Sequence, residues 1–223
     1  MLEAAKAHEK KYLEAKSAGL PGWGGIDRIS QLPRMIDERF FALKDAPRQG
    51  RLLELGCGAG NLSLALAERG FDVYGVDFSA TAIEWAKENA VRARQNIQLE
   101  VADVCDLSSL KEESFDIVYD GYCFHCIIGE KRMIALAEWK RVLKPGGLLF
   151  ISSLCATSED AQFPDTFDTR TRVQTEPGFP SRYITTPEHL EAEIQSVGFE
   201  ILKVFVRTES PFGHINIHAR RPD

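Results

Sequence analysis

The sequence lacks any apolar run long enough to cross a membrane, and it lacks the apolar leader of a secreted protein. Residues 1–19 instead mix charged and small apolar side chains, which predicts an amphipathic helix. Cysteine is scarce as well. The chain of 223 residues has five, an odd number that favours reduced thiols over a disulfide framework. We therefore expect a cytoplasmic protein with no membrane span.

An excess of positive charge is also missing. The chain has 27 Lys and Arg against 33 Asp and Glu, a net charge of −6 at pH 7. Proteins that bind nucleic acids usually present a basic surface, so a nucleic-acid partner is not expected. There is no internal repeat or low-complexity segment, and 223 residues fit a single domain with a sizeable core. The sequence leaves monomer and homodimer open.

What the sequence does have is a strand, a glycine loop, a helix and a second strand between Arg51 and Asp77. The apolar runs at 52–55 and 73–76 predict buried parallel strands. Closely spaced glycines between them allow a tight turn and a close approach of the backbone to a ligand: Gly56, Gly58 and Gly60. Asp77 ends the second strand about 20 residues past the first glycine, where a nucleotide-binding unit of this kind grips a ribose. This stretch predicts a cofactor that contains adenosine.

The spacing of the glycines separates one adenosine cofactor from another. A dinucleotide loop has the pattern G-x-G-x-x-G, but here the third glycine comes one place early and Asn61 stands where the last glycine is needed. Glu54, two residues before the first glycine, would repel a pyrophosphate and suits a cationic ligand. Asn61 is also expected to cap the helix that follows, which Gly70 would end in the left-handed conformation. The pattern therefore disfavours a nicotinamide dinucleotide.

The run E-x-G-x-G-x-G resembles the signature of the class I S-adenosylmethionine-dependent methyltransferases. Further stretches match that family in order and spacing: Asp77–Phe78, the strand 98–101 with Asp103, the strand Phe115–Tyr119, and the turn Leu143–Gly147 before an apolar strand. The resemblance implies S-adenosylmethionine as the cofactor, whose sulfonium and ammonium charges fit the Glu54 carboxylate. It implies that Asp77 holds the ribose hydroxyls and that Phe78 packs on the adenine.

The same resemblance implies the remaining cofactor contacts. Asp103, with Val104 beside it, would meet the adenine amino group, and Asp120 and Gly121 would line the methionine part. The expected cofactor-binding residues are therefore Glu54, Gly56, Gly58, Gly60, Asp77, Phe78, Asp103, Val104, Asp120 and Gly121.

The alternation of strands and helices over 51–154 predicts a doubly wound α/β fold. The resemblance implies a seven-stranded, mostly parallel sheet with one antiparallel edge strand and helices on both faces. We expect one methyltransferase domain over 1–223. It would comprise an N-terminal helical cap (1–50) with a second helix near Pro33, a cofactor-binding core (51–154), a lid loop (155–185), and a C-terminal helix and strands (186–223).

The acceptor of the methyl group is expected beside the segment 120–126, because ligands of open α/β sheets bind outside the carboxyl ends of the strands. His125 in this segment is the candidate general base, since a histidine titrates near neutral pH. The alternative is that His125 bonds to a loop backbone or packs over the cofactor. Further acceptor contacts are expected from aromatic and basic side chains: Tyr12, Trp23, Tyr122, Arg182 and Tyr183.

Other reactive residues give weaker signals. Cys123 and Cys126 form a C-x-x-C pair around His125, but a structural zinc site needs four ligands and no second pair follows, so no metal is expected. His214 and His218 share one face of the last predicted strand, and with no carboxylate or cysteine beside them they do not define a site.

Three functions compete. The first is methylation of O, N or S of a small-molecule acceptor by in-line displacement. The second is methylation of a protein or an RNA, which the acidic balance disfavours. The third is binding of S-adenosylmethionine without catalysis, as in a sensor or scaffold, because the cofactor residues alone do not distinguish a binder from an enzyme.

Overall fold

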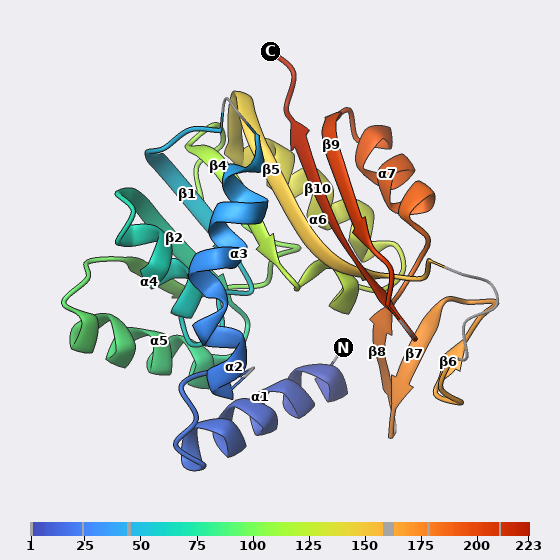
Figure 1. Ribbon diagram of the computed structural model, residues 1–223, viewed down its shortest axis with the longest axis horizontal. Coiled ribbons are helices and arrows are strands. Elements are labelled where there is room, and N and C mark those ends of the chain that lie inside the picture. The colour runs from blue at the N-terminus through green and yellow to red at the C-terminus, as the bar shows by residue number, and fades with distance from the viewer. Residues whose placement is uncertain (1, 24, 44–45, 158–162, 178, 210) are drawn as a thin grey trace. The chain divides into compact units, whose positions relative to one another are not determined.

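The computed structural model of the protein describes residues 2–23, 25–43, 46–157, 163–177, 179–209 and 211–223 (Figure 1). The chain divides into two compact units. The first comprises residues 1–104 and 115–117, and the second comprises 105–114 and 118–223. The single domain expected over 1–223 stays a prediction.

The first unit begins with helices and continues with alternating strands and helices. Its helical elements are α1 (Leu2–Ser17), α2 (Gly25–Ser30), α3 (Leu32–Arg39), the 3₁₀ turn η1 (Phe40–Ala42), α4 (Asn61–Ala67) and α5 (Ala80–Ala93). Its strands are β1 (Gly50–Leu55), β2 (Phe71–Asp77) and β3 (Gln98–Val101), together with the start of β4 (Phe115–Gly121). Helix α4 packs on β2, and α1 packs along α5.

The second unit contains the rest of β4 and all later elements. Its helical elements are the 3₁₀ turn η2 (Phe124–Cys126), α6 (Lys131–Val142) and α7 (Pro187–Ser196). Its further strands are β5 (Leu143–Cys155), β6 (Phe167–Asp168), β7 (Val173–Glu176), β8 (Phe179–Tyr183), β9 (Glu200–Arg207) and β10 (Gly213–Arg220). Thr186 caps α7, because its side chain accepts a hydrogen bond from His189 N at 3.3 Å.

The main sheet has seven strands in the order β3-β2-β1-β4-β5-β10-β9. Strands β1, β2 and β3 are parallel neighbours, and β10 runs antiparallel to both β5 and β9. The expected α/β fold with a mostly parallel seven-stranded sheet is thus confirmed. The antiparallel strand β10 is second from the edge, and β9 forms the edge itself.

The central strands β1, β4 and β5 are largely buried, and their buried positions are mostly apolar. Leu52, Leu53 and Leu55 of β1 have no exposed surface, as expected for a parallel strand covered on both faces. In the second unit, Phe124 and Trp139 are also fully buried, with ring centroids 5.0 Å apart. Within the described residues, we find no helix that is both long and apolar enough to pass through a bilayer.

Three local expectations need correction. Asn61 does not cap α4, because Gly60 occupies the cap position in the left-handed conformation and Asn61 is the first helical residue. The described residues of the N-terminal segment 1–50 form three α-helices and not the two expected segments. Pro33 does lie in the first turn of α3, as predicted. Residues 155–185 are not a structureless loop, since β6, β7 and β8 form a separate three-stranded sheet there.

Candidate functional site

The glycine loop of the first unit uses backbone conformations that other residues rarely adopt. Gly56, Gly58 and Gly60 have φ angles of 67°, 54° and 76°. A Cβ atom on Gly60 would lie 3.0 Å from the Ala86 side chain, and one on Gly58 would lie 2.9 Å from the Tyr12 hydroxyl. Glycine is therefore needed for φ at all three positions, and at Gly58 and Gly60 also for space.

Asp77 lies at the end of β2 and turns its carboxylate back onto this loop. Its Oδ2 accepts hydrogen bonds from Gly58 N at 2.9 Å and from the Tyr12 hydroxyl at 3.3 Å, and its Oδ1 accepts one from Ser79 N at 2.9 Å. The side chain is buried, and burial raises the pKa of Asp77 despite these hydrogen bonds. A fixed carboxylate stands where the sequence places the ribose contact.

A second buried carboxylate, that of Glu54, lies two residues before the loop. Glu54 is 3% exposed and accepts a hydrogen bond from the hydroxyl of Ser63 in α4. Burial raises the pKa of the Cys57 thiol well above its ordinary value, and the negative charges of Glu54 and Asp77 raise it further. Cys57 therefore stays a neutral filler under the loop. The electrostatic character of this region is anionic, which suits a cationic ligand.

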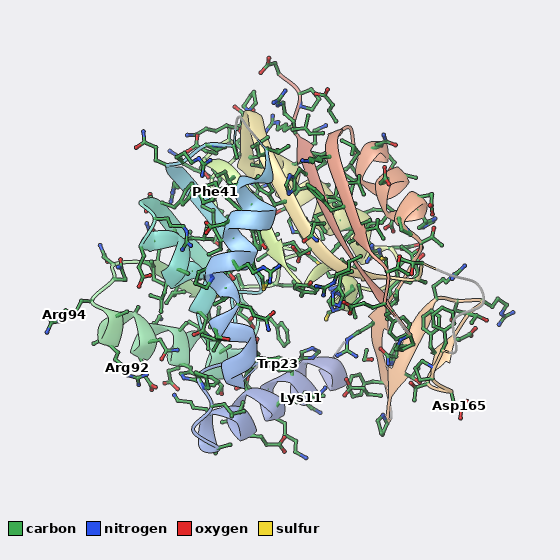
Figure 2. All side chains as sticks on the ribbon, in the orientation of Figure 1. Lys11, Trp23, Phe41, Arg92, Arg94 and Asp165 are labelled. Carbon is green, nitrogen blue, oxygen red and sulfur yellow. The ribbon has the colours of Figure 1, made fainter. Side chains whose placement is uncertain are left out.

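Aromatic side chains gather where β2 ends. Phe78 is 42% exposed, so one face of its ring is open to a planar ligand. The His8 ring stacks on Trp23 at 5.5 Å and meets Phe78 edge-on at 5.6 Å, and Tyr12 packs against Trp23 at 4.8 Å. In Figure 2, Lys11 of α1 reaches toward Trp23, with its Nζ 5.7 Å from the ring centroid.

Helix α1 is held next to these residues by one carboxylate. Glu9 accepts hydrogen bonds from the hydroxyls of Ser79 and Thr81 and from Thr81 N at 3.2 Å. These hydrogen bonds lower the pKa of Glu9, although its partial burial opposes them. The expected placement of Tyr12 and Trp23 over the cofactor region is compatible with this arrangement, and their contact with an acceptor stays a prediction.

The segment after β3 lies beside the end of β2, because Ala102 N donates a hydrogen bond to Asp77 O at 3.0 Å. Asp103 in this segment is exposed, and Val104 is buried. The first unit therefore joins Asp77 to the glycine loop and places the segment after β3 beside it. The carboxylates of Glu54 and Asp77, the glycine loop and the exposed Phe78 ring fit an adenosine ligand that carries positive charge.

In the second unit, Asp120 near the end of β4 is fully buried. Its Oδ1 accepts hydrogen bonds from Cys123 N and Phe124 N, both at 2.9 Å, and so holds the start of η2. Among the described residues, nothing donates a hydrogen bond to its Oδ2. Burial raises the pKa of Asp120 to about 7. The predicted contact of Asp120 and Gly121 with the cofactor remains untested.

Replacing Asp120 by Asn is expected to flatten the dependence of stability on pH. An unfolded aspartate titrates near 3.8, so at pH values between this and about 7 the folded chain holds a proton that the unfolded chain has lost. Stability conferred by the protonated carboxyl is therefore lost as the pH rises through this window, on the order of 4 kcal/mol when complete. Urea unfolding at pH 5, 6, 7 and 8 measures it. Parallel curves for wild type and Asp120→Asn would contradict this prediction.

His125 lies in η2 and is only 6% exposed. Its Nδ1 is 3.5 Å from the Ser153 hydroxyl, and its ring meets that of Tyr122 at 6.1 Å. Arg132 holds the turn on both sides of it, donating hydrogen bonds to Phe124 O at 2.9 Å and Ile127 O at 3.1 Å. Such burial limits direct access to an acceptor, so its role as a general base stays a prediction.

Tyr122 connects β4 to a histidine and a carboxylate that the sequence analysis did not combine. The Tyr122 hydroxyl is 3.0 Å from His214 Nδ1, and His214 Nε2 is 3.3 Å from Glu209 Oε2. We missed this cluster because 92 positions separate Tyr122 from His214. One feature of the sequence could have indicated part of this cluster: Glu209 lies five residues before His214.

The two other predicted acceptor contacts from this unit lie on β8. Arg182 donates a hydrogen bond to Gln174 Oε1 at 3.1 Å, across to β7. The ring of Tyr183 packs under the guanidinium of Arg132, 4.7 Å from its centre. Both side chains have structural partners, and their contact with an acceptor stays a prediction. In the part of the chain that the structure describes, no three His, Cys, Asp or Glu side chains gather in a way that could hold a metal ion.

Comparison with known proteins identifies the central domain. Residues 53–151, which run from β1 into β5, match the family described as "Methyltransferase domain". This part of the chain is a methyltransferase domain. The matched region contains the glycine loop, Asp77, Asp103 and residues 143–147, the motifs on which the sequence interpretation rests. The structure places residues 143–147 at the start of β5 and not in a turn before it.

Curated relatives of this methyltransferase domain differ in their chemistry. The chain is 33% identical over 108 residues to the tRNA N(3)-cytidine methyltransferase METTL2 of Mus musculus, a match covering 45% of this chain and 28% of that protein. It is 34% identical over 131 residues to the S-adenosyl-L-methionine-dependent Diels-Alderase iccD of Talaromyces variabilis, covering 57% and 44%. The chain thus spans less than half the length of these relatives.

A solved structure matches nearly the whole chain. The 1,6-didemethyltoxoflavin-N1-methyltransferase of Burkholderia thailandensis, solved with its substrate and S-adenosylhomocysteine, has a TM-score of 0.71 and 19% identity. The match covers 99% of this chain and 90% of that one. At this identity the likeness establishes the fold, including the parts of the chain outside residues 53–151.

Proposed function

We propose that this protein transfers the methyl group of S-adenosylmethionine to an oxygen, nitrogen or sulfur atom of a small molecule. The observation that carries the proposal is the pair of buried carboxylates, Glu54 and Asp77, on either side of a left-handed glycine loop. When bound, the cofactor supplies a methyl group that is attached to a positively charged sulfur. This sulfur is a good leaving group, because it departs as a neutral thioether.

The residues of this chain would act mainly by binding and positioning. Asp77 would accept hydrogen bonds from the ribose hydroxyls, and Phe78 would cover the adenine. The buried carboxylate of Glu54 would favour the cationic end of the ligand. Alignment of an acceptor with the methyl group can supply about 7–11 kcal/mol of the barrier. Acid–base help would add about 10²–10⁴ in rate, and His125 is the residue that the sequence predicts for it.

Two alternatives have support of their own. The match to a tRNA methyltransferase supports an RNA or protein acceptor, but it covers only 28% of that relative, and the net charge of −6 opposes nucleic-acid binding. The match to a Diels-Alderase supports binding of the cofactor without methyl transfer. A small-molecule acceptor agrees best with the acidic balance of the chain.

We also propose that the protein acts in the cytoplasm as a monomer or homodimer, with residues 1–223 as one domain. The odd number of cysteines supports the location, since disulfide-rich proteins belong to oxidising compartments. The full-length match to one solved methyltransferase supports the domain assignment.

Calorimetric titration tests which cofactor the protein binds. Transfer of a labelled methyl group tests whether the protein catalyses methylation and of which class of molecule. We expect S-adenosylmethionine and S-adenosylhomocysteine to bind and NAD not to bind. With methyl-labelled S-adenosylmethionine and a cellular extract fractionated by size, we expect the label in small molecules. Binding of NAD alone would overturn the cofactor. Label found only in RNA or protein would overturn the acceptor class, and donor binding with no labelled product would favour the non-catalytic alternative.

A further inference from the structure

Three side chains of the second unit form a continuous chain of polar contacts from β4 to the end of β9–β10. They are Tyr122, which directly follows β4, His214 of β10, and Glu209 in the connection between β9 and β10. The Tyr122 hydroxyl lies 3.0 Å from His214 Nδ1, and His214 Nε2 lies 3.3 Å from a carboxylate oxygen of Glu209. We call these three residues the tyrosine relay.

The carboxylate determines which way the relay conducts a proton. An ionised carboxylate has no hydrogen to donate, so we assign the hydrogen of a neutral His214 ring to Nε2, which lies 3.3 Å from Glu209 Oε2. Nδ1 is then an acceptor, and the Tyr122 hydroxyl donates to it. A tyrosine whose proton is already shared with an imidazole is prepared to take a proton from a group on its other side.

The backbone holds Tyr122 in an unusual conformation. Its φ is +73°, in the left-handed region that bulky residues avoid. Tyr122 N donates a hydrogen bond to Ser152 O at 3.0 Å, and the buried Ser152 hydroxyl is bound to Asn216 Oδ1 at 2.8 Å. Strands β5 and β10 therefore fix the residue. Strain of this kind is concentrated at functional sites, because surrounding contacts must maintain it.

The outer end of the relay reaches solvent. Tyr122 and His214 are half-buried, with the His214 side chain 22% exposed, and the side chain of Glu209 is 45% exposed. Arg207 pairs with the other oxygen of Glu209 at 2.7 Å and keeps this carboxylate in place. A proton received inside can thus leave to solvent from His214. Among the contacts described, Arg207 faces the relay at Glu209, and His125 faces it at the Tyr122 ring.

We propose that the tyrosine relay is the base of the methyl transfer, and that the acceptor is a hydroxyl compound bound against Tyr122. This inference rests on the proposed function and adds the chemical class of its substrate. A hydroxyl must lose its proton as it is methylated, whereas a neutral amine can react through its lone pair. The contact between Tyr122 and His214 assigns proton transfer to these two residues. His125 is buried beside the Tyr122 ring and takes no part in the proposed transfer.

The proposed step balances in atoms and charge. The acceptor oxygen gives an electron pair to the methyl carbon, and the pair of the breaking carbon–sulfur bond stays on sulfur. The hydroxyl proton passes to Tyr122 Oη while the Tyr122 proton passes to His214 Nδ1. The imidazolium that forms is paired with Glu209 until it releases its proton to water.

One test needs no acceptor. Nitrogen NMR of the imidazole groups, with S-adenosylhomocysteine as the added ligand, reports the tautomer of His214 and its titration midpoint. We expect the Nε2–H tautomer, and we expect Glu209→Gln to lower the midpoint because the imidazolium loses its partner. A His214 that carries its hydrogen on Nδ1, or a midpoint that Glu209→Gln leaves unchanged, would overturn the relay.

The second test follows labelled methyl from S-adenosylmethionine into a small-molecule extract. We expect the label in O-methyl ethers or esters, at a rate that Tyr122→Phe lowers by about 10²–10⁴-fold, the usual contribution of a general base. Tyr74→Phe removes a tyrosine hydroxyl bound to Glu100 in the first unit and serves as the matched control, expected to change the rate little. Calorimetry should give the same donor affinity for all three proteins.

The outcomes separate the relay from the proposed function. Label in amines or thioethers, with a rate that Tyr122→Phe leaves within about 3-fold of wild type, overturns the relay and keeps the methyltransferase assignment. A wild type that binds S-adenosylmethionine but labels nothing overturns the proposed function, and the relay's catalytic role with it.

Discussion

Replacing Asp77 by Asn is expected to weaken the binding of S-adenosylmethionine by about 100-fold or more, which corresponds to about 3 kcal/mol. The carboxylate has two oxygens that accept hydrogen bonds, from Gly58 N and Ser79 N, and an amide offers only one acceptor. The other end of the amide would point a donor at a donor. Calorimetric titration of both proteins with S-adenosylmethionine measures the loss.

The pH dependence of donor binding gives a second measure of the same carboxylate. Burial raises the pKa of Asp77, so acid removes its charge at a higher pH than it would for an exposed aspartate. The ionised form is the one that accepts hydrogen bonds on both oxygens. Affinity is therefore present above this raised pKa and is lost as the pH falls through it, and Asp77→Asn should remove that loss.

Asp72→Asn is the matched control, because it makes the same change on the same strand at a side chain that is 62% exposed. It should leave donor affinity within about 2-fold of wild type, as surface changes usually do. Circular dichroism separates loss of the site from loss of the fold. If Asp77→Asn does not fold, Phe78→Ala replaces it, and donor affinity unchanged in that variant would remove Phe78 from the proposed adenine contact.

The residues that the sequence predicted well are those whose roles are set locally. The glycine loop, Asp77 and the strands around them lie within one stretch of chain, and the left-handed glycines and buried leucines follow from the residue types themselves. The match of 53–151 to the methyltransferase domain confirmed this part of the chain for the same reason. Local patterns carry this part of the fold.

The residues that the sequence missed depend on contacts between distant parts of the chain. Whether His214 has a carboxylate and a tyrosine beside it depends on the pairing of β10 with β5 and β9, which places His214 opposite Leu154 and Arg207. The sequence predicts a loop where β6, β7 and β8 form a sheet, because these strands are short and polar. It predicts Asn61 as the helix cap because side-chain preference alone does not account for the left-handed conformation of Gly60.

The burial of Arg132 is another feature that the sequence does not predict, because none of the neighbouring residues indicates it. The side chain is 4% exposed and forms a two-pronged pair with Glu193 of α7, at 2.8 and 2.7 Å. Its guanidinium also lies 3.8 Å from the centre of the Phe124 ring and donates to carbonyls on both sides of His125. One side chain therefore holds η2 against α7.

Replacing Arg132 by Met is expected to lower the free energy of unfolding by about 3–5 kcal/mol, because Glu193 is left as a largely buried charge without its partner. Arg132→Lys should also lose much of this stability, since an ammonium cannot form the two-pronged pair. Urea unfolding at pH 7.5 measures both. The double change Arg132→Met with Glu193→Leu should recover part of the loss, because it removes both charges together.

Lys10→Met is the control for loss of a positive charge. Lys10 pairs with Glu14 at 3.7 Å on the surface of α1, where the two side chains are 77% and 63% exposed. Exposed pairs of this kind contribute about 0.3–0.5 kcal/mol, so this variant should unfold close to wild type. If Arg132→Met were no less stable than Lys10→Met, the Arg132–Glu193 pair would not be what holds η2, and the placement of Tyr122 and His125 would have to depend on Asp120 and the strand pairing alone.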